Sequence, residues 1–328
     1  MTHPASDLVE TARALGARLA ASAAARDAAR QLPHEEMRAL AASGILAARV
    51  PRAAGGPEVD LPTLAALFVH IAQGDPNIAQ AMQPHACGIE KIKLYGDARQ
   101  QQFFFGLVRD GALITNASAE RSGRVVGDIH TVLEPADGAW RLHGTKHYCT
   151  GSLFASHFYV LSTRRGPDAG ERARSLAIVP RERAGVDVSD DWDGMGQRTT
   201  ASGTVRFDGV AVQDAEHLPL PDAGTRRTHE GAYAQLLHAA VGGGIALAAL
   251  DDAAAYGRDH ARAVPEARVA RASDDPYVQQ SVGQMAVLAH GAQALLERAA
   301  RILEPAAAAV LAGKPDERQL GLASVAVA

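Results

Sequence analysis

The sequence predicts an α+β protein in which helices at both ends of the chain flank a central group of strands. Apolar residues recur at helical spacing over residues 6–31 and 231–260. β-branched and aromatic residues become frequent after residue 111. With 47% hydrophobic and 21% charged residues among 328, the chain can bury a large core, which excludes a disordered or low-complexity scaffold.

Residues 1–111 predict a helical domain. The second helix is expected to start near Pro33 and to stop at Gly44, because proline favours the first turn of a helix and glycine its end. The other helices are expected at residues 6–31, 61–73, 77–95 and 98–110.

Residues 112–214 predict a β domain. Two strand-like segments, 124–133 and 139–148, flank Asp137 and Gly138, a residue pair typical of a two-residue hairpin turn. Further strands are expected at residues 158–163, 175–179 and 204–212.

Residues 215–328 predict a second helical domain that follows a proline- and charge-rich linker at 214–230. Helices are expected at 231–260, at 276–303 and from residue 317 onward. The last residues, GLASVAVA, continue a helical pattern without a stop signal, so we expect an incomplete helical bundle. The glycine run at 242–244 lacks the spacing of a nucleotide-binding loop and indicates close helix packing.

Charge and cysteine content exclude several classes of protein. The formal net charge of -4 leaves no positive excess for binding nucleic acid or an anionic membrane surface. The longest apolar run, 239–250, is too short to span a bilayer, and the acidic N-terminal segment is unlike a secretory signal. Cys87 and Cys149 provide no disulfide framework, which predicts a cytoplasmic protein.

No metal site is predicted. His143, His147 and Cys149 share odd numbering and so would share one face of a strand. No carboxylate or second cysteine accompanies them, and a strand facing a pocket often carries such residues. Phosphate-loop, nucleophile-elbow and HExxH motifs are absent from the sequence as well.

Several motifs resemble the acyl-CoA dehydrogenase superfamily. The stretch PHEEMRALAASGILAARVP at residues 33–51, followed by Gly55 and Gly56, resembles its amino-terminal domain. The segments LITNASAER (113–121), GTKHYCTGSLFA (144–155) and GMGQRTTASGTVRFDGVAVQ (194–213) resemble its flavin-contacting segments in order and approximate spacing. The resemblance implies an N-terminal helical domain, a central β-barrel-like domain and a C-terminal helical bundle.

Within that superfamily, GTKHYCTGSLFA, DWDGMGQRTTASGT (191–204) and RASDDPY (271–277) are most similar to the sulfur-acquisition oxidoreductases of the SfnB type, in the dibenzothiophene monooxygenase-like branch. This resemblance implies a monooxygenase that receives reduced FMN from a separate flavin reductase. The flavin would form a hydroperoxide that oxygenates a small organosulfur compound. A homotetramer built on the C-terminal helices is also implied.

Two other functions remain open. The first is an FAD-dependent acyl-CoA dehydrogenase, but Gln235 stands in the stretch where some dehydrogenases carry the catalytic glutamate, and an amide cannot take an α-proton. The FAD pyrophosphate motif of the dehydrogenases is also replaced by RDHAR at residues 258–262. The second is a truncated, flavin-free paralogue that forms oligomers.

The resemblance also implies roles for individual residues. Asn116 and Ser118 would meet the polar edge of the flavin, while Tyr148, Cys149 and Thr150 would contact its ring system. For the polar residues, a hydrogen-bonded turn or strand position is the alternative. Cys149 replaces the serine usual in relatives, so a buried thiol that only fills space is an equal alternative.

Two further residues are candidates for catalysis and phosphate binding. His85 lies in the helical segment that resembles the one facing the reactive side of the flavin, where it could donate a hydrogen bond to the peroxide. A half-buried structural histidine is the alternative. Arg271 could bind the flavin phosphate through its guanidinium, or it could be an ordinary surface charge.

Overall fold

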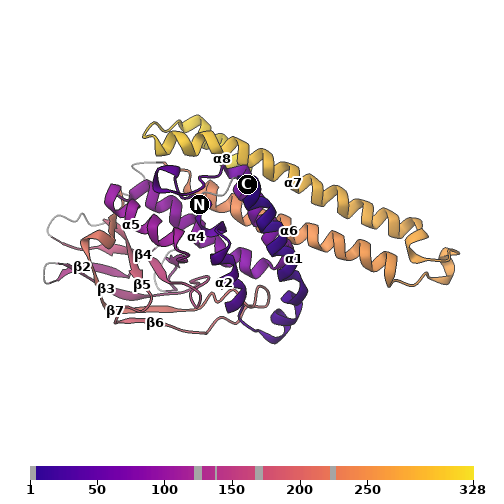
Figure 1. The fold of residues 1–328 in the computed structure, drawn as a ribbon, viewed down its shortest axis with the longest axis horizontal. Coiled ribbons are helices and arrows are strands. Elements are labelled where there is room, and N and C mark those ends of the chain that lie inside the picture. Colours follow the sequence, from indigo (N-terminus) through magenta and orange to yellow (C-terminus); the bar gives the residue numbers. More distant parts are fainter. Residues whose placement is uncertain (1–4, 122–127, 137–138, 167–172, 222–226) are drawn as a thin grey trace.

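A computed structural model describes residues 5–121, 128–136, 139–166, 173–221 and 227–328 of the chain. Figure 1 shows the sheet at one end of the molecule, the N-terminal helices against it, and a long hairpin of two C-terminal helices that projects beyond the body. The predicted order of helices, strands and helices is therefore confirmed.

The N-terminal helices agree with the sequence prediction. Aspartates cap three of them: Asp60, Asp75 and Asp97 each accept a hydrogen bond from a backbone N–H in the first turn, which satisfies donors that the helix itself leaves unpaired. Two short 3-10 turns, η1 (Ile45–Ala47) and η2 (Arg52–Ala54), follow the second helix. The helices are α1 (Ala5–Ala29), α2 (His34–Ala42), α3 (Leu61–Gly74), α4 (Pro76–Tyr95) and α5 (Ala98–Arg109).

The middle of the chain forms one mixed sheet with the order β6-β7-β3-β2-β4-β5-β8, and β1 pairs with β4 in parallel. Its inward-facing side chains, such as Leu142, Phe158 and Phe207, form a core of their own. The strands are β1 (Ile114–Ala117), β2 (Val132–Ala136), β3 (Ala139–Lys146), β4 (His157–Arg164), β5 (Arg174–Pro180), β6 (Val186–Val188), β7 (Val205–Val212) and β8 (His217–Pro219).

The predicted hairpin exists, with corrected boundaries. β2 and β3 pair antiparallel and meet at Ala136 and Ala139, but β2 begins at Val132, so the predicted strand 124–133 is wrong over residues 128–131. Part of that prediction, and the turn residues Asp137 and Gly138, lie outside the described residues. β3 ends at Lys146 rather than at residue 148, because Tyr148 has a φ of 56°, a left-handed conformation that a strand does not continue.

The C-terminal helices are α6 (Glu230–Asp259), α7 (Pro276–Leu311) and α8 (Glu317–Val327). α7 continues past the predicted end at residue 303 and through Pro305, because the following turn buries Ala306, Ala307 and Val310 against the core. The predicted linker contains a short turn, η3 (Asp214–Glu216), and the strand β8. α6 is long and apolar enough to cross a membrane, but half of its apolar window is buried in the protein, as in a core helix.

Small residues allow α1, α3 and α6 to approach closely. A Cβ atom on Gly74 would lie 2.1 Å from the carbonyl oxygen of Gly16, and one on Gly244 would lie 2.6 Å from that of Val69. The predicted close packing at 242–244 is thus confirmed at Gly244. These contacts join the two helical domains into one hydrophobic core.

Candidate active site

The structure brings five of the predicted site residues onto two adjacent segments, the end of β1 and the turn after β3. A β-bridge joins Ala119 to His147. The Thr115 hydroxyl donates a hydrogen bond to the carbonyl oxygen of Thr150. The segment that carries Asn116 and Ser118 therefore runs beside the Tyr148–Cys149–Thr150 turn.

A third segment, residues 197–203, supports this turn. The backbone N–H groups of Cys149 and Gly151 donate to the carbonyl oxygens of Gly203 and Thr200 at 3.0 and 2.9 Å, and the hydroxyls of Thr150 and Ser202 are 2.9 Å apart. Three non-glycine residues here have left-handed backbones with φ of 48–56°: Tyr148, Gln197 and Ala201. Such conformations cost free energy and gather at functional sites, which marks these segments as a candidate site.

Side chains on the turn differ in what they offer a ligand. The Tyr148 ring is half exposed, with the Arg121 guanidinium 5.2 Å from its centre and Trp192 edge-on at 6.5 Å. Cys149 is fully buried, and burial raises the pKa of its thiol to about 12, so the thiol is neutral and fills space in the sheet core.

A buried ion pair holds the Ser118 segment in place. The Lys146 ammonium lies 2.7 Å from Oε1 of Glu120 and 3.2 Å from the carbonyl oxygen of Ser118. Burial alone would raise the pKa of Glu120, but hydrogen bonds from Lys146, His130 and Thr131 lower it to about 2. Glu120 is a positioning residue that the sequence analysis missed, although it stands inside one of the quoted motifs.

A cavity of about 220 Å³ lies where α4, β1, β4 and α6 meet, and Asn116 reaches its wall. The side-chain Oδ1 of Asn116 is buried and has no hydrogen-bond partner in the part of the chain that the structure describes. A buried amide without a partner is costly, and a bound molecule would remove that cost. The wall also includes Gln83, Cys87, Glu90, Lys91, Tyr159, Glu230 and Tyr233.

The Glu90 carboxylate is part of a buried charge network behind this cavity. Its Oε1 accepts hydrogen bonds from Nε of Arg49 and Nζ of Lys93, both at 2.9 Å, and its Oε2 lies 3.2 Å from Nε2 of His229. Burial alone would raise the pKa of Glu90, but Lys93, His229 and Arg49 hold it well below its ordinary value. Glu90 therefore stays ionised.

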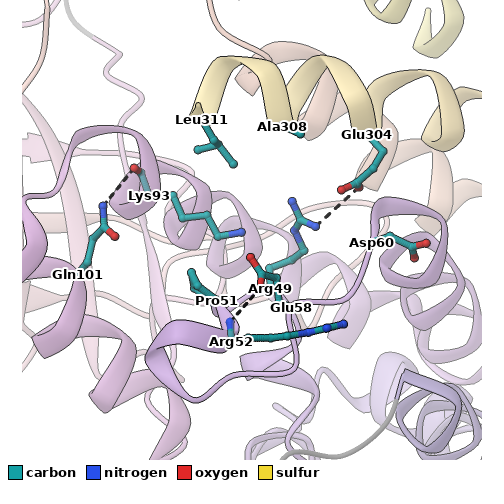
Figure 2. Close-up of a pocket in the computed structure, with 10 residues that line it drawn as sticks. All are labelled: Arg49, Pro51, Arg52, Glu58, Asp60, Lys93, Gln101, Glu304, Ala308 and Leu311. Atoms are coloured by element: carbon teal, nitrogen blue, oxygen red, sulfur yellow. Dashed lines mark hydrogen bonds and ion pairs between the residues drawn. The ribbon is translucent and has the colours of Figure 1, made fainter. Parts of the chain in front are cut away.

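Arg49 and Lys93 also line a second, larger cavity of about 570 Å³ between the N-terminal loops and α7. Figure 2 shows the Lys93 ammonium directed into this cavity and the Arg49 guanidinium directed toward Glu304. Arg49 and Lys93 thus line the larger cavity. They also contact Glu90, which lines the Asn116 cavity.

A second ion pair lies at the wall of the Asn116 cavity. Lys91 pairs with Glu230, which also accepts hydrogen bonds from the hydroxyls of Tyr95 and Thr228. The Lys91 ammonium lies 5.9 Å from the ring centre of Tyr159. Burial alone would raise the pKa of Glu230, but Lys91 and the hydrogen bonds lower it, so this carboxylate is ionised too.

His85 occupies a different environment from the one expected of a catalytic donor. It is 1% exposed, its Nε2 lies 2.9 Å from the carbonyl oxygen of Leu46, and its Nδ1 accepts from the backbone N–H of Ile114 at 3.0 Å. Both ring nitrogens are thus engaged, and burial lowers the pKa to about 4, so the ring is neutral. This geometry indicates a residue that joins α4 to η1 and β1, and catalysis by His85 stays a prediction.

Arg271 lies far from residues 113–121 and 144–155, the segments of its own chain that resemble flavin-contacting segments. It immediately precedes the short turn η5 (Ala272–Asp274) in the connection between α6 and α7, at the projecting end of the hairpin in Figure 1. Its guanidinium is exposed and forms an ion pair with Asp274 at 2.9 Å. Within one chain, Arg271 therefore cannot complete a site with Asn116.

The histidines considered as metal ligands have separate partners. Nδ1 of His143 accepts from the backbone N–H of Gly209 at 3.2 Å, and Nδ1 of His147 lies 3.1 Å from the Thr204 hydroxyl. Among the described residues, no group of three or more His, Cys, Asp or Glu side chains is arranged to hold a metal ion.

Three family models match the chain: the N-terminal domain of acyl-CoA dehydrogenase over residues 3–111, its middle domain over 115–210 and its C-terminal domain over 236–328. The chain belongs to the acyl-CoA dehydrogenase family.

Particular relatives are monooxygenases. The chain is 33% identical to dibenzothiophene monooxygenase of Rhodococcus qingshengii over 307 residues, which cover 91% of this chain and 74% of the relative. It is 29% identical to the probable FMNH2-dependent monooxygenase SfnC of Pseudomonas putida, covering 92% and 75%. The FMN-bound structure of TdsC from Paenibacillus sp. A11-2 superimposes with a TM-score of 0.90 at 29% identity, covering 98% of this chain and 81% of TdsC.

Proposed function

We propose that the protein is a reduced-FMN-dependent monooxygenase that oxygenates a small organosulfur compound. The observation that carries the proposal is the unpartnered Oδ1 of Asn116 at the cavity wall. Its neighbour on β1, Thr115, holds the strained Tyr148–Cys149–Thr150 turn through a hydrogen bond to the Thr150 carbonyl oxygen. The dibenzothiophene monooxygenase and SfnC similarities support the same function.

The residues present fit a flavin. A reduced flavin offers N–H donors along the edge of its ring system, and the free acceptor of Asn116 matches such a donor. The half-exposed Tyr148 ring offers a flat surface, and the Thr150 and Ser202 hydroxyls offer further hydrogen bonds. When bound, reduced FMN supplies the two electrons that activate molecular oxygen.

The chain's own residues bind and orient the flavin and shield the reaction from water. Asn116 fixes the edge of the ring system, and the buried Lys146–Glu120 pair fixes the segment that carries Ser118. The rings of Tyr159 and Tyr233 supply apolar surface to the wall, which limits the access of water to the reacting oxygen. In the overall reaction one oxygen atom goes to sulfur and the other leaves as water, with two electrons and two protons from reduced FMN.

The proposal includes a separate flavin reductase, because this reaction consumes one reduced flavin in each turnover. An FAD-dependent acyl-CoA dehydrogenase would instead need a carboxylate base whose pKa lies near the working pH. The sequence analysis found no such base, and the structure places two carboxylates, Glu90 and Glu230, at the cavity wall. Because neighbouring cations lower the pKa of both, neither is suited to take an α-proton.

We also propose a cytoplasmic homotetramer. The hairpin of α6 and α7 exposes Val287, Leu288 and Leu295 on one side of α7, each about two-thirds exposed or more, and Ile245 on α6. An apolar strip of this kind suits contact with another copy of the chain. Arg271, at the end of the same hairpin, would then reach the flavin phosphate of a neighbouring subunit.

The test supplies reduced FMN anaerobically, adds aerated buffer with an organosulfur compound, and measures oxygen consumption and product. We expect product formation that depends on FMN, and we expect Asn116→Ala to weaken FMN binding about tenfold through the lost hydrogen bond. Gln102→Ala, on the exposed side of α5, is the matched control. Bleaching of bound FAD by an acyl-CoA would instead support the dehydrogenase, and absence of any flavin affinity would support the flavin-free paralogue.

A further inference from the structure

The charges around the Asn116 cavity are fully paired. Lys91 forms an ion pair with Glu230, while Arg49 and Lys93 both contact Glu90, and Arg49 also lies 3.8 Å from Glu304. The charged side chains that line the cavity itself are two carboxylates, Glu90 and Glu230, and one ammonium, Lys91, which gives a formal sum of -1. Any anion entering the cavity would have to compete with a carboxylate that already holds the cation.

Lys91 is the cation that a ligand in the cavity could reach. Glu90 separates the cavity from Arg49 and Lys93, whose side chains are 5% and 7% exposed. Glu230 holds the Lys91 ammonium, and two hydroxyls, those of Tyr95 and Thr228, hold Glu230 in turn. Because both carboxylates at the wall are ionised, an anion would also meet like charge.

The uncharged part of the wall is better suited to a neutral molecule. Tyr159, Tyr233, Pro84 and Ala234 supply aromatic and aliphatic surface that carries no formal charge. At about 220 Å³ the cavity is smaller than sites for drug-sized ligands, so the molecule is small.

We propose that this cavity selects small uncharged organosulfur compounds, such as sulfides and sulfoxides, over sulfinate and sulfonate anions, and that the Lys91–Glu230 pair sets this preference. The inference rests on the proposed function, since it assigns the substrate class of the same site. It makes Glu230 a specificity-determining residue: the carboxylate neutralises a lysine that would otherwise bind an anionic sulfur group.

The test compares dimethyl sulfoxide with methanesulfinate, which are similar in size and differ in charge. Each gains one oxygen atom in the reaction, giving dimethyl sulfone and methanesulfonate. With reduced FMN supplied, we expect kcat/KM of the wild-type protein to favour the sulfoxide by about tenfold or more. Glu230→Gln keeps an acceptor for Tyr95 and Thr228 but frees Lys91, so we expect the ratio to move about tenfold toward the sulfinate.

Two further variants attribute the change to the charge of Lys91. The double variant Lys91→Met, Glu230→Gln is expected to return the ratio to near its wild-type value. Glu317→Gln removes an exposed carboxylate that pairs with Arg227 and is expected to leave the ratio unchanged. A wild-type protein that oxygenates the sulfinate as well as the sulfoxide, or a Glu230→Gln variant with an unchanged ratio, would overturn the inference.

Calorimetry separates this inference from the proposed function. Titration of methanesulfinate into the protein without flavin should give about tenfold tighter binding to Glu230→Gln than to wild type. If neither compound is oxygenated, the proposed function fails, while the calorimetric comparison still decides the inference. Equal sulfinate binding by both proteins would contradict the role of Glu230 even where oxygenation of the sulfoxide is observed.

Discussion

Replacing Glu90 by glutamine should destabilise the protein severely. The carboxylate is 1% exposed and contacts two cations, Arg49 and Lys93, as well as His229. An amide would remove the anion that Lys93 contacts and would leave Arg49 only the carboxylate of Glu304, 3.8 Å away. Breaking a buried pair in this way costs about 3–5 kcal/mol. In a chain of this size that loss lowers the melting temperature by about 4–7 °C.

The assay is urea unfolding at pH 7 and at pH 3. Because the folded-state pKa of Glu90 is lowered, its stabilisation is present above the unfolded value of about 4.3 and declines as the pH falls below it. The difference between wild type and Glu90→Gln should therefore shrink at pH 3. Glu297→Gln, which removes half of an exposed pair with Arg301, should change the free energy of unfolding by less than about 1 kcal/mol. If Glu90→Gln lowered the free energy of unfolding by no more than this control does, the reasoning would be refuted.

Two other predictions concern packing and the role of His85. In thermal unfolding, Gly74→Ala should lower the stability by about 3 kcal/mol or more, because the new Cβ would overlap the Gly16 carbonyl. Gly106→Ala on α5 places its Cβ where nothing lies within 4 Å, so it should be neutral or stabilising by about 0.5–1 kcal/mol. His85→Ala should lower the free energy of unfolding by about 2 kcal/mol or more, since it leaves the Leu46 carbonyl and the Ile114 N–H unpaired. If His85 is only structural, oxygenated product per folded protein stays unchanged at low temperature, whereas loss of product from folded protein would support the predicted catalytic role.

Much of the helical framework could be predicted because its signals are local. The aspartates that cap α3, α4 and α5 and the period of the apolar residues fix those helices within a few residues. The short strands β1, β6 and β8 were missed, since their stability comes from pairing with distant strands rather than from their own three or four residues.

The candidate site was predictable in part. Asn116, Ser118 and the Tyr148–Cys149–Thr150 turn stand in motifs, and the fold places the two segments side by side, while their contact with a flavin stays a prediction. Glu90, Lys91 and Glu230 were missed because the residues come from α4 and α6, and no sequence spacing reveals that the two helices meet. The partners of His85 likewise come from η1 and β1 and could not be read from α4 alone.

The central claim is that the cavity beside Asn116 supports oxygenation of sulfur by reduced FMN. The most direct test supplies reduced FMN and isotopically labelled molecular oxygen with dimethyl sulfoxide, and follows the mass of the product. We predict dimethyl sulfone that carries one labelled oxygen atom, with the yield falling in Asn116→Ala and unchanged in Gln102→Ala. Reoxidation of the flavin at the rate of free FMN, without labelled sulfone, would contradict the account.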